Sequence, residues 1–331
     1  MTLKGQTARF LIGVLLLTMA SFSFSSCSGT GIDLAGGGVS GTGVSTGSIT
    51  DFGSVLMNGV HYLTDSDVAP DFITHKFSHG TDNTSMTARN LFRIGMVVTI
   101  RHGANDNDAQ QIEYQDNLQG RIAAKNSGAE NTVTVLGQTV VVSDAAVFAS
   151  LNLNEIVEVS GFVDSAGRIR ATYIERNPQS HHHGGEFEVK GFVSGLSSSG
   201  FQLGPLPDGT GTPVAVSFVG AGLANGMYVK VVTTGAQPVS GPISATSVVE
   251  LTPRTVFPEK SRVDLEGLVT APPSSSGTIV SFAVEGKQIG TDNSTQFPVG
   301  TTVADIRTDM RVQVQGTENG GVLSAARIIF R

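Results

Sequence analysis

The chain has 331 residues, with 41 Gly, one Cys and no Trp, and only 15% of its residues are charged. Abundant Val, Thr and Ser and few charged helix formers argue against helical bundles and coiled coils and favour β structure. The net charge of −7 opposes a phosphate backbone, and the lack of Trp removes the strongest stacking platform, so we expect no nucleic-acid partner.

The first predicted element is an export signal. Lys4 and Arg9 form a short basic region before the apolar run FLIGVLLLTMA. This run is too short to span a bilayer as a helix, as is usual for a signal peptide. We therefore expect the mature protein to be exported.

The end of this signal carries the only cysteine. Residues 1–26 followed by Cys27 resemble a bacterial lipoprotein signal peptide, in which a small residue precedes an invariant Cys, although Phe24 departs from that pattern. The resemblance implies lipid attachment at Cys27 and, with Ser28 following it, an outer-membrane location. A lone Cys cannot form an internal disulfide, which also favours lipidation. Ordinary secretory cleavage, with Cys27 incidental, is the alternative.

A tether and four repeats follow. Residues 27–46 are rich in Gly, Ser and Thr and predict a flexible tether. Each repeat then begins with a Gly beside short β-branched alternation, and these glycines are 73, 71 and 76 residues apart: Gly47, Gly120, Gly191 and Gly267. Each repeat also has an apolar residue shortly before its fourth predicted strand: Phe92, Leu151, Leu223 and Ile306.

The repeats divide the rest of the chain into four units. The predicted boundaries are unit 1 at 47–116 with an insertion at 64–90, unit 2 at 117–177, a His-rich linker at 178–185, unit 3 at 186–253, a linker at 254–261, and unit 4 at 262–331. A repeat of this length fits small separate domains better than the shorter periods of solenoids.

Each unit is expected to contain five short strands. The second and third form a hairpin, for which Asn58-Gly59 in unit 1 supplies the residues of a type I′ turn. The longest connection falls between the third and fourth strands, and insertions there should be surface loops. This layout predicts an all-β protein of tandem, OB-like, five-stranded barrels. One continuous β-sandwich or solenoid remains the alternative.

The segments ITDFGSVLMNGVHYLTD, RIGMVVTIRHG, TVTVLGQTVVV and VEVSGFVDSAGRIRATYIE resemble a known family. It is the repeated domain of bacterial envelope proteins called domain of unknown function 5666. The resemblance is strongest over residues 43–176 and weaker over 186–331. It implies small β-barrels, often in tandem behind a lipoprotein signal, and it implies no catalytic residue.

Histidines are the candidate metal ligands. His181, His182 and His183 lie in the linker after unit 2, where adjacent side chains point in different directions and a solvated linker is the simpler interpretation. His75 and His79 in the unit 1 insertion have the spacing that would place two ligands on one face of a helix. No cofactor is expected.

Two acidic clusters contain carboxylates that could bind calcium, but they lack the spacing of a known calcium loop. They are Asp65, Asp67 and Asp71 in the insertion, and Asp106 and Asp108 after it. Neither cluster matches a helix-flanked twelve-residue calcium loop. Turn formation explains these residues more simply.

Two further patterns could suggest catalysis. Ser45 is the centre of a G-x-S-x-G match, GVSTG, but a tether precedes it and a β pattern follows, whereas the motif needs a strand before the Ser and a helix after it. Glu155 and Glu158 are three residues apart on one predicted strand and so face opposite sides. We expect neither to be catalytic.

The sequence therefore predicts a non-enzymatic cell-envelope lipoprotein that presents repeated β-barrel units for binding or structural spacing. Its partners would be the membrane, through the lipid anchor, and an envelope protein or polysaccharide, although the aromatic platform usual at sugar sites lacks Trp here. Alternatives are a small-ligand or metal-binding protein that uses the unit 1 insertion, and a degenerate enzyme.

Overall fold

The computed structural model describes most of the chain after the tether. The described residues are 43–52, 55–63, 73–76, 92–103, 109–176, 186–234, 241–276 and 279–331. Residues 40–331 form one compact unit. Within the described ranges, no helix is both long and apolar enough to cross a membrane. The predicted signal peptide, Cys27 and most of the predicted tether lie outside these ranges.

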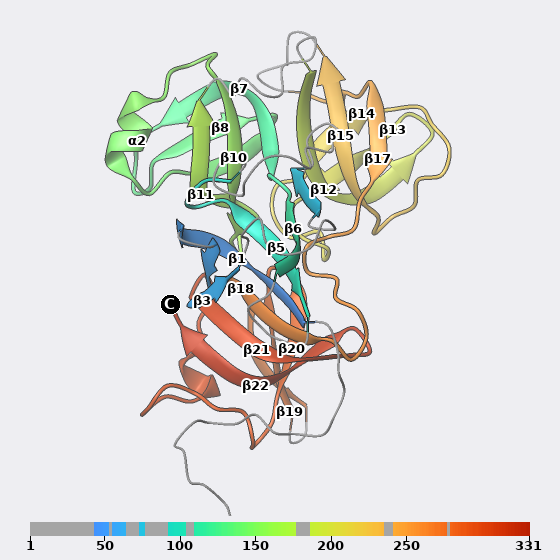
Figure 1. The fold of residues 1–331 in the computed structure, drawn as a ribbon. Coiled ribbons are helices and arrows are strands. Elements are labelled where there is room, and N and C mark those ends of the chain that lie inside the picture. Colours follow the sequence, from blue (N-terminus) through green and yellow to red (C-terminus); the bar gives the residue numbers. More distant parts are fainter. Residues whose placement is uncertain are drawn as a thin grey trace, which may run out of the picture. The chain divides into compact units, whose positions relative to one another are not determined.

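Barrel 2 has the expected strand order most completely. Its elements are β7 (Leu118–Asn126), β8 (Thr132–Val135), β9 (Gln138–Val141), α2 (Ala145–Ser150), β10 (Ile156–Val163) and β11 (Ile169–Arg176). Antiparallel pairings join β7 to β8 and β8 to β9, and a parallel pairing joins β9 to β11. Antiparallel pairings of β10 with β11 and with β7 close the barrel. This is the strand order of an OB-like barrel, with α2 between the third and fourth strands (Figure 1).

Barrels 3 and 4 repeat this order. Barrel 4 consists of β18 (Arg262–Ser276), β19 (Ile279–Val284), β20 (Lys287–Thr291), η1 (Val303–Asp305), β21 (Arg311–Asn319) and β22 (Val322–Phe330). Barrel 3 consists of β12 (Glu186–Ser197), β13 (Gly200–Gly204), β14 (Val214–Ser217), β15 (Tyr228–Thr234) and a fifth strand divided into β16 (Ile243–Ser244) and β17 (Ser247–Glu250). The predicted all-β fold of tandem OB-like barrels is confirmed.

Barrel 1 departs from the prediction in two places. Its strands are β1 (Gly43–Phe52), β2 (Val55–Met57), β3 (Val60–Tyr62), β4 (Ile73–Lys76), β5 (Val97–His102) and β6 (Ala109–Tyr114). The predicted surface loop of the insertion contains β4, which pairs in parallel with β6 where a third strand would lie. The strand β1 already begins at Gly43, so the last residues assigned to the tether are paired backbone.

The hairpin turns follow the predicted chemistry. Asn58 and Gly59 have φ angles of 57° and 79°, as a type I′ turn requires. Barrel 4 uses Glu285 and Gly286 in the same way, with φ angles of 51° and 76°. Each turn folds back over the Gly that begins its repeat: a Cβ on Gly47 would lie 2.4 Å from Asn58 Oδ1, and one on Gly267 would lie 2.5 Å from Glu285 Cγ. The repeated glycines are therefore required by the close approach of the turn.

The barrels are joined through their first strands. In barrel 1, Gly43–Thr46 extends beyond the hairpin and pairs in parallel with Arg262–Leu265 of barrel 4. In barrel 2, Leu118 and Gln119 pair antiparallel with barrel 3. These pairings produce two eleven-stranded sheets. An open strand edge can pair with another chain. Here the first strands of two barrels pair with each other, so neither edge is left open. The alternatives of separate barrels and one continuous β architecture are thus resolved as closed barrels fused in pairs.

Barrels 2 and 3 share one buried apolar cluster, whereas barrels 1 and 4 each have a cluster of their own. The predicted apolar residue before the fourth strand is buried in three barrels and packs against the core in the other: Phe92, Leu151, Ile306 and Leu223. A small cluster of Val97, Phe162 and Leu268 then joins barrels 1, 2 and 4. Burial of such side chains contributes about 1.5–3 kcal/mol each.

Candidate functional site

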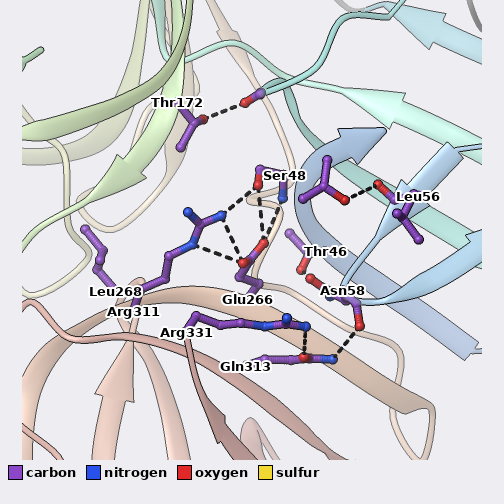
Figure 2. Close-up of polar contacts among 12 residues, drawn as sticks. Thr46, Ser48, Leu56, Asn58, Thr172, Glu266, Leu268, Arg311, Gln313 and Arg331 are labelled. Carbon is purple, nitrogen blue, oxygen red and sulfur yellow. Dashed lines mark hydrogen bonds and ion pairs between the residues drawn. The ribbon is translucent and has the colours of Figure 1, made fainter. Parts of the chain in front are cut away.

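A buried polar network lies at the junction of barrels 1 and 4, and Figure 2 shows two of its members, Asn58 and Gln313. The Asn58 amide at the β2–β3 turn donates to Asp264 Oδ1 at 3.1 Å and to the Thr46 carbonyl at 3.2 Å. Gln313 Nε2 donates to both Asp264 oxygens at 2.8 Å and to the Asn58 carbonyl at 3.2 Å. Gln315 Nε2 adds a bond of 3.0 Å to Asp264 Oδ2. Neutral amides from two barrels therefore converge on one carboxylate.

An ion pair lies beside this network. Glu266, the residue before the repeat glycine of barrel 4, accepts bonds from the Ser48 amide at 3.0 Å and from Arg311 Nη2 at 2.9 Å. Arg311 Nη2 also donates to Ser48 Oγ at 2.7 Å. Figure 2 shows Arg311, Glu266 and Ser48 as one closed group that joins β1 to β18 and β21.

The Asp264 carboxyl gives this junction a pH dependence. Burial raises its pKa from 3.8 to about 6, and the bonds from Gln315 and Gln313 only partly oppose that shift. The folded state therefore binds the Asp264 proton more tightly than the unfolded state, and the resulting stability is lost as pH rises through about 6. We expect acidification from neutral pH to pH 5, about one unit below the folded pKa, to contribute about 1–1.5 kcal/mol to the free energy of unfolding through this group.

Urea unfolding of the wild type and of Asp264→Asn at both pH values measures this contribution. Burial also raises the pKa of Glu285, so the wild type alone would not isolate Asp264. An equal pH response in the two proteins would contradict the assignment to Asp264.

A second buried network lies at the junction of barrels 2 and 3. Lys190 Nζ lies 2.7 Å from Asp116 Oδ1 and 2.6 Å from Glu188 Oε1, and the side chain of Lys190 is only 1% exposed. Lys230 approaches Glu188 at 3.4 Å. Burial alone would lower the pKa of Lys190, but the two carboxylates offset this and raise it. Lys190 is therefore a permanent cation inside the protein.

A third network ties barrel 4 to barrel 2. Glu285, at the hairpin turn of barrel 4, accepts bonds from the Val163 amide at 3.0 Å and from Arg254 Nη2 at 3.0 Å. Arg254 Nη2 also donates to the Gly161 carbonyl at 2.7 Å. Arg254 comes from the segment before barrel 4, so one guanidinium holds this segment against two barrels.

Between these last two networks lies a hollow that is partly open to solvent. Its cavity volume is about 40 Å³. The polar residues that line it come from barrels 2, 3 and 4 and the segment before barrel 4: Asn117, Gln138, Lys190, Tyr228, Arg254, Thr255 and Glu285. Phe192 and Leu206 are among its apolar lining. The hollow has room for about three water molecules or for a few non-hydrogen atoms of a ligand.

Apart from His75, the residues predicted to bind lipid or metal lie outside the described residues. They are Cys27, His79, His181–His183 and the five candidate aspartates. His75 lies in the strand β4, so the helical spacing assumed for His75 and His79 does not apply at His75. Within the described ranges, no three His, Cys, Asp or Glu side chains form a group suited to a metal ion.

The structure brings Ser45 to a histidine that is remote in sequence. Ser45 Oγ lies 3.3 Å from His102 Nε2, and the Tyr62 hydroxyl donates to the same oxygen at 2.7 Å. Ser45 lies in the strand β1, not at a strand-to-helix turn, and it is 1% exposed. A substrate could not reach this oxygen without opening the barrel, so the contacts are a buried structural cluster.

The two glutamates of barrel 2 have unrelated environments. Glu155 pairs with Arg176 at 2.6 Å near the surface. Glu158 is fully buried and accepts a bond of 2.7 Å from the Tyr114 hydroxyl of barrel 1. Burial and the nearby Glu158 charge raise the pKa of Tyr114, which keeps its proton on the phenol. The expectation that the glutamates do not act as a pair agrees with this geometry.

Sequence reasoning missed the residues that form the junctions. A signal was present, because each repeat glycine is preceded by a polar residue where strand alternation leads into the barrel: Thr46, Gln119, Lys190 and Glu266. All four are buried. A polar residue repeated at one register position of a strand indicates a shared contact rather than a solvated face.

These features define a protein of fused OB-like barrels with buried polar junctions. The model of the family described as domain of unknown function (DUF5666) matches residues 119–175 and 266–329. The two matched regions fall within barrels 2 and 4, which is consistent with repeats of one domain. One match lies where the resemblance was expected to be strongest, and the other in the half where it was expected to be weaker. No curated protein matched the chain.

Proposed function

We propose that the chain is a non-enzymatic cell-envelope lipoprotein that presents its four barrels as one preassembled body, for binding or for structural spacing. The observation that carries this proposal is the fusion of the barrels through their first strands. Independent barrels joined only by flexible linkers would not need these strand pairings. Because the pairings fix the barrels relative to one another, the surfaces of several barrels keep constant relative positions.

The buried polar junctions support the same proposal. A charge buried between barrels is costly to leave unpaired, so each junction favours the assembled state over separated barrels. Lys190, Glu266 and Glu285 are each paired across or beside such a junction. These groups are engaged in holding the barrels together, which favours a structural role over catalysis.

The envelope location rests on the sequence of the signal and on Cys27. We expect mass spectrometry of the mature N-terminus, from protein purified from membranes, to find Cys27 as the first residue with lipid attached. Cys27→Ser should release the protein from the membrane fraction without changing its unfolding midpoint. An unmodified mature N-terminus at any other residue would refute the anchor, and a turnover abolished by one point mutation would refute the non-enzymatic role.

A further inference from the structure

The hollow between barrels 2, 3 and 4 contains polar groups that the protein itself leaves without partners. Gln138 is 3% exposed and lines the hollow, yet its side chain forms no hydrogen bond with any described residue. The Tyr228 hydroxyl lines the same space and likewise has no bond within the described ranges. The polar atoms of both side chains are not sealed in the interior, since neither belongs to the fully buried atoms without a partner, so they can be reached from the hollow. Such an arrangement indicates a site for an external polar group.

Further donors face the same space. Asn117 uses its Oδ1 to accept a bond from the Gly161 amide at 2.8 Å, which leaves its Nδ2 available. Arg254 uses only Nη2 in its bonds to Gly161 and Glu285. Gln138 and Tyr228 can each donate or accept, whereas Asn117 and Arg254 can only donate. A ligand must therefore offer several oxygen acceptors together with at least one hydroxyl donor.

The charges around the hollow cancel. Lys190 and Arg254 line it as cations, and Glu285 lines it as an anion. Lys190 is held by Asp116 and Glu188, and Lys230 lies 3.4 Å from Glu188. Three positive and three negative side chains therefore surround the site. A free anion would gain little Coulomb energy here, and a neutral ligand fits better.

The hollow also offers an aromatic surface. The Phe192 and Tyr228 rings pack against each other with centroids 4.9 Å apart and an interplanar angle of 52°. Both residues are half-buried, so part of each ring is exposed. Because the enclosed volume is only about 40 Å³, the polar arm of a ligand can enter while its body lies against these rings.

We propose that the mouth of this hollow binds one sugar unit of a saccharide, with hydroxyl groups of the sugar entering toward Gln138, Tyr228, Asn117 and Arg254 and the ring C–H groups outside against Phe192. A sugar is neutral and carries hydroxyl groups that both donate and accept, as these partners require. The site lies at the junction of three barrels, so it exists only in the assembled body.

Saturation-transfer NMR on the whole protein tests this proposal with methyl glucoside, methyl galactoside and N-acetylglucosamine as probes. We expect at least one of them to bind at millimolar concentration. Gln138→Leu should weaken that binding about tenfold through the loss of a hydrogen bond, and Tyr228→Phe should weaken it in the same direction. Gln288→Leu, on an exposed position of β20, should bind as the wild type does.

Gln138→Leu also separates a binding role from a structural one. Because the amide has no partner within the protein, its replacement should leave the urea midpoint unchanged or raise it while binding falls. Three results would overturn the proposal: no binding of any of the three sugars, binding of acetate or phosphate in their place, or equal sugar affinity in Gln138→Leu and the wild type.

Discussion

Lys190→Met is expected to lower the free energy of unfolding by about 3–5 kcal/mol, the typical loss when one partner of a buried ion group is removed. Lys190 is the central cation between Asp116 and Glu188, and its side chain is 1% exposed. Met fills a similar volume, so the loss would come from the two uncompensated carboxylates rather than from a cavity. The midpoint of urea unfolding at neutral pH measures it.

Lys230→Met is the matched control for this prediction. Lys230 contacts the same Glu188, but at 3.4 Å and with 17% of its side chain exposed. We expect its replacement to lower the free energy of unfolding by less than about 1 kcal/mol. A further variant that combines Lys190→Met with Asp116→Asn and Glu188→Gln should recover part of the loss, because it removes the uncompensated charges. A loss below about 1 kcal/mol in Lys190→Met would contradict a buried ionic junction.

Removal of barrel 4, by ending the chain at Thr252, is expected to unfold part of barrel 1 as well. The first strand of barrel 1 would lose the pairing of Gly43–Thr46 with β18. Asn58 would lose Asp264 and Gln313, and in barrel 2 the amides of Val163 and Ser165 would lose their carboxylate acceptors. Each buried group left without a partner costs about 1–3 kcal/mol, so the remaining barrels should lose more than about 5 kcal/mol of stability.

Hydrogen exchange followed by mass spectrometry measures this effect. Peptides covering 43–52 should exchange much faster in the shortened chain than in the full chain, while peptides covering 132–141 in barrel 2 should change less. A full-length chain with two residues inserted at the turn Gly320-Gly321 is the control, since both glycines are exposed and a Cβ on either would meet no neighbouring atom. Equal exchange of 43–52 in all three proteins would mean that the barrels are independent, and the single-body proposal would fail.

The repeat and its strand order could be predicted from the sequence because both depend on local signals. Gly47 and the Asn58-Gly59 turn follow from backbone conformation within one unit, and Phe92 marks the apolar residue before the fourth strand. Such signals span a few tens of residues at most. These local signals are enough to specify one barrel, and the same signals recur in each repeat.

The way the barrels assemble could not be predicted in this way. The pairing of β1 with β18 depends on which of several similar strand edges meet, and all four units carry nearly the same edge pattern. The hollow was missed for the same reason. Gln138 follows a hairpin turn in barrel 2, and nothing next to it in sequence indicates that Tyr228 and Arg254 lie across from it.

The pairing of β1 with β18 also determines the order in which the chain can complete its fold. Ser48 and Glu266, which join the two strands, are 218 residues apart. Contacts between such distant segments form late, because the intervening chain must first be made and arranged. Until barrel 4 has been made and has folded, the edge at Gly43–Thr46 is bare and can pair with the strands of a neighbouring chain. The last barrel to form thus completes the first, and a chain that still lacks a folded barrel 4 is the form most prone to aggregate.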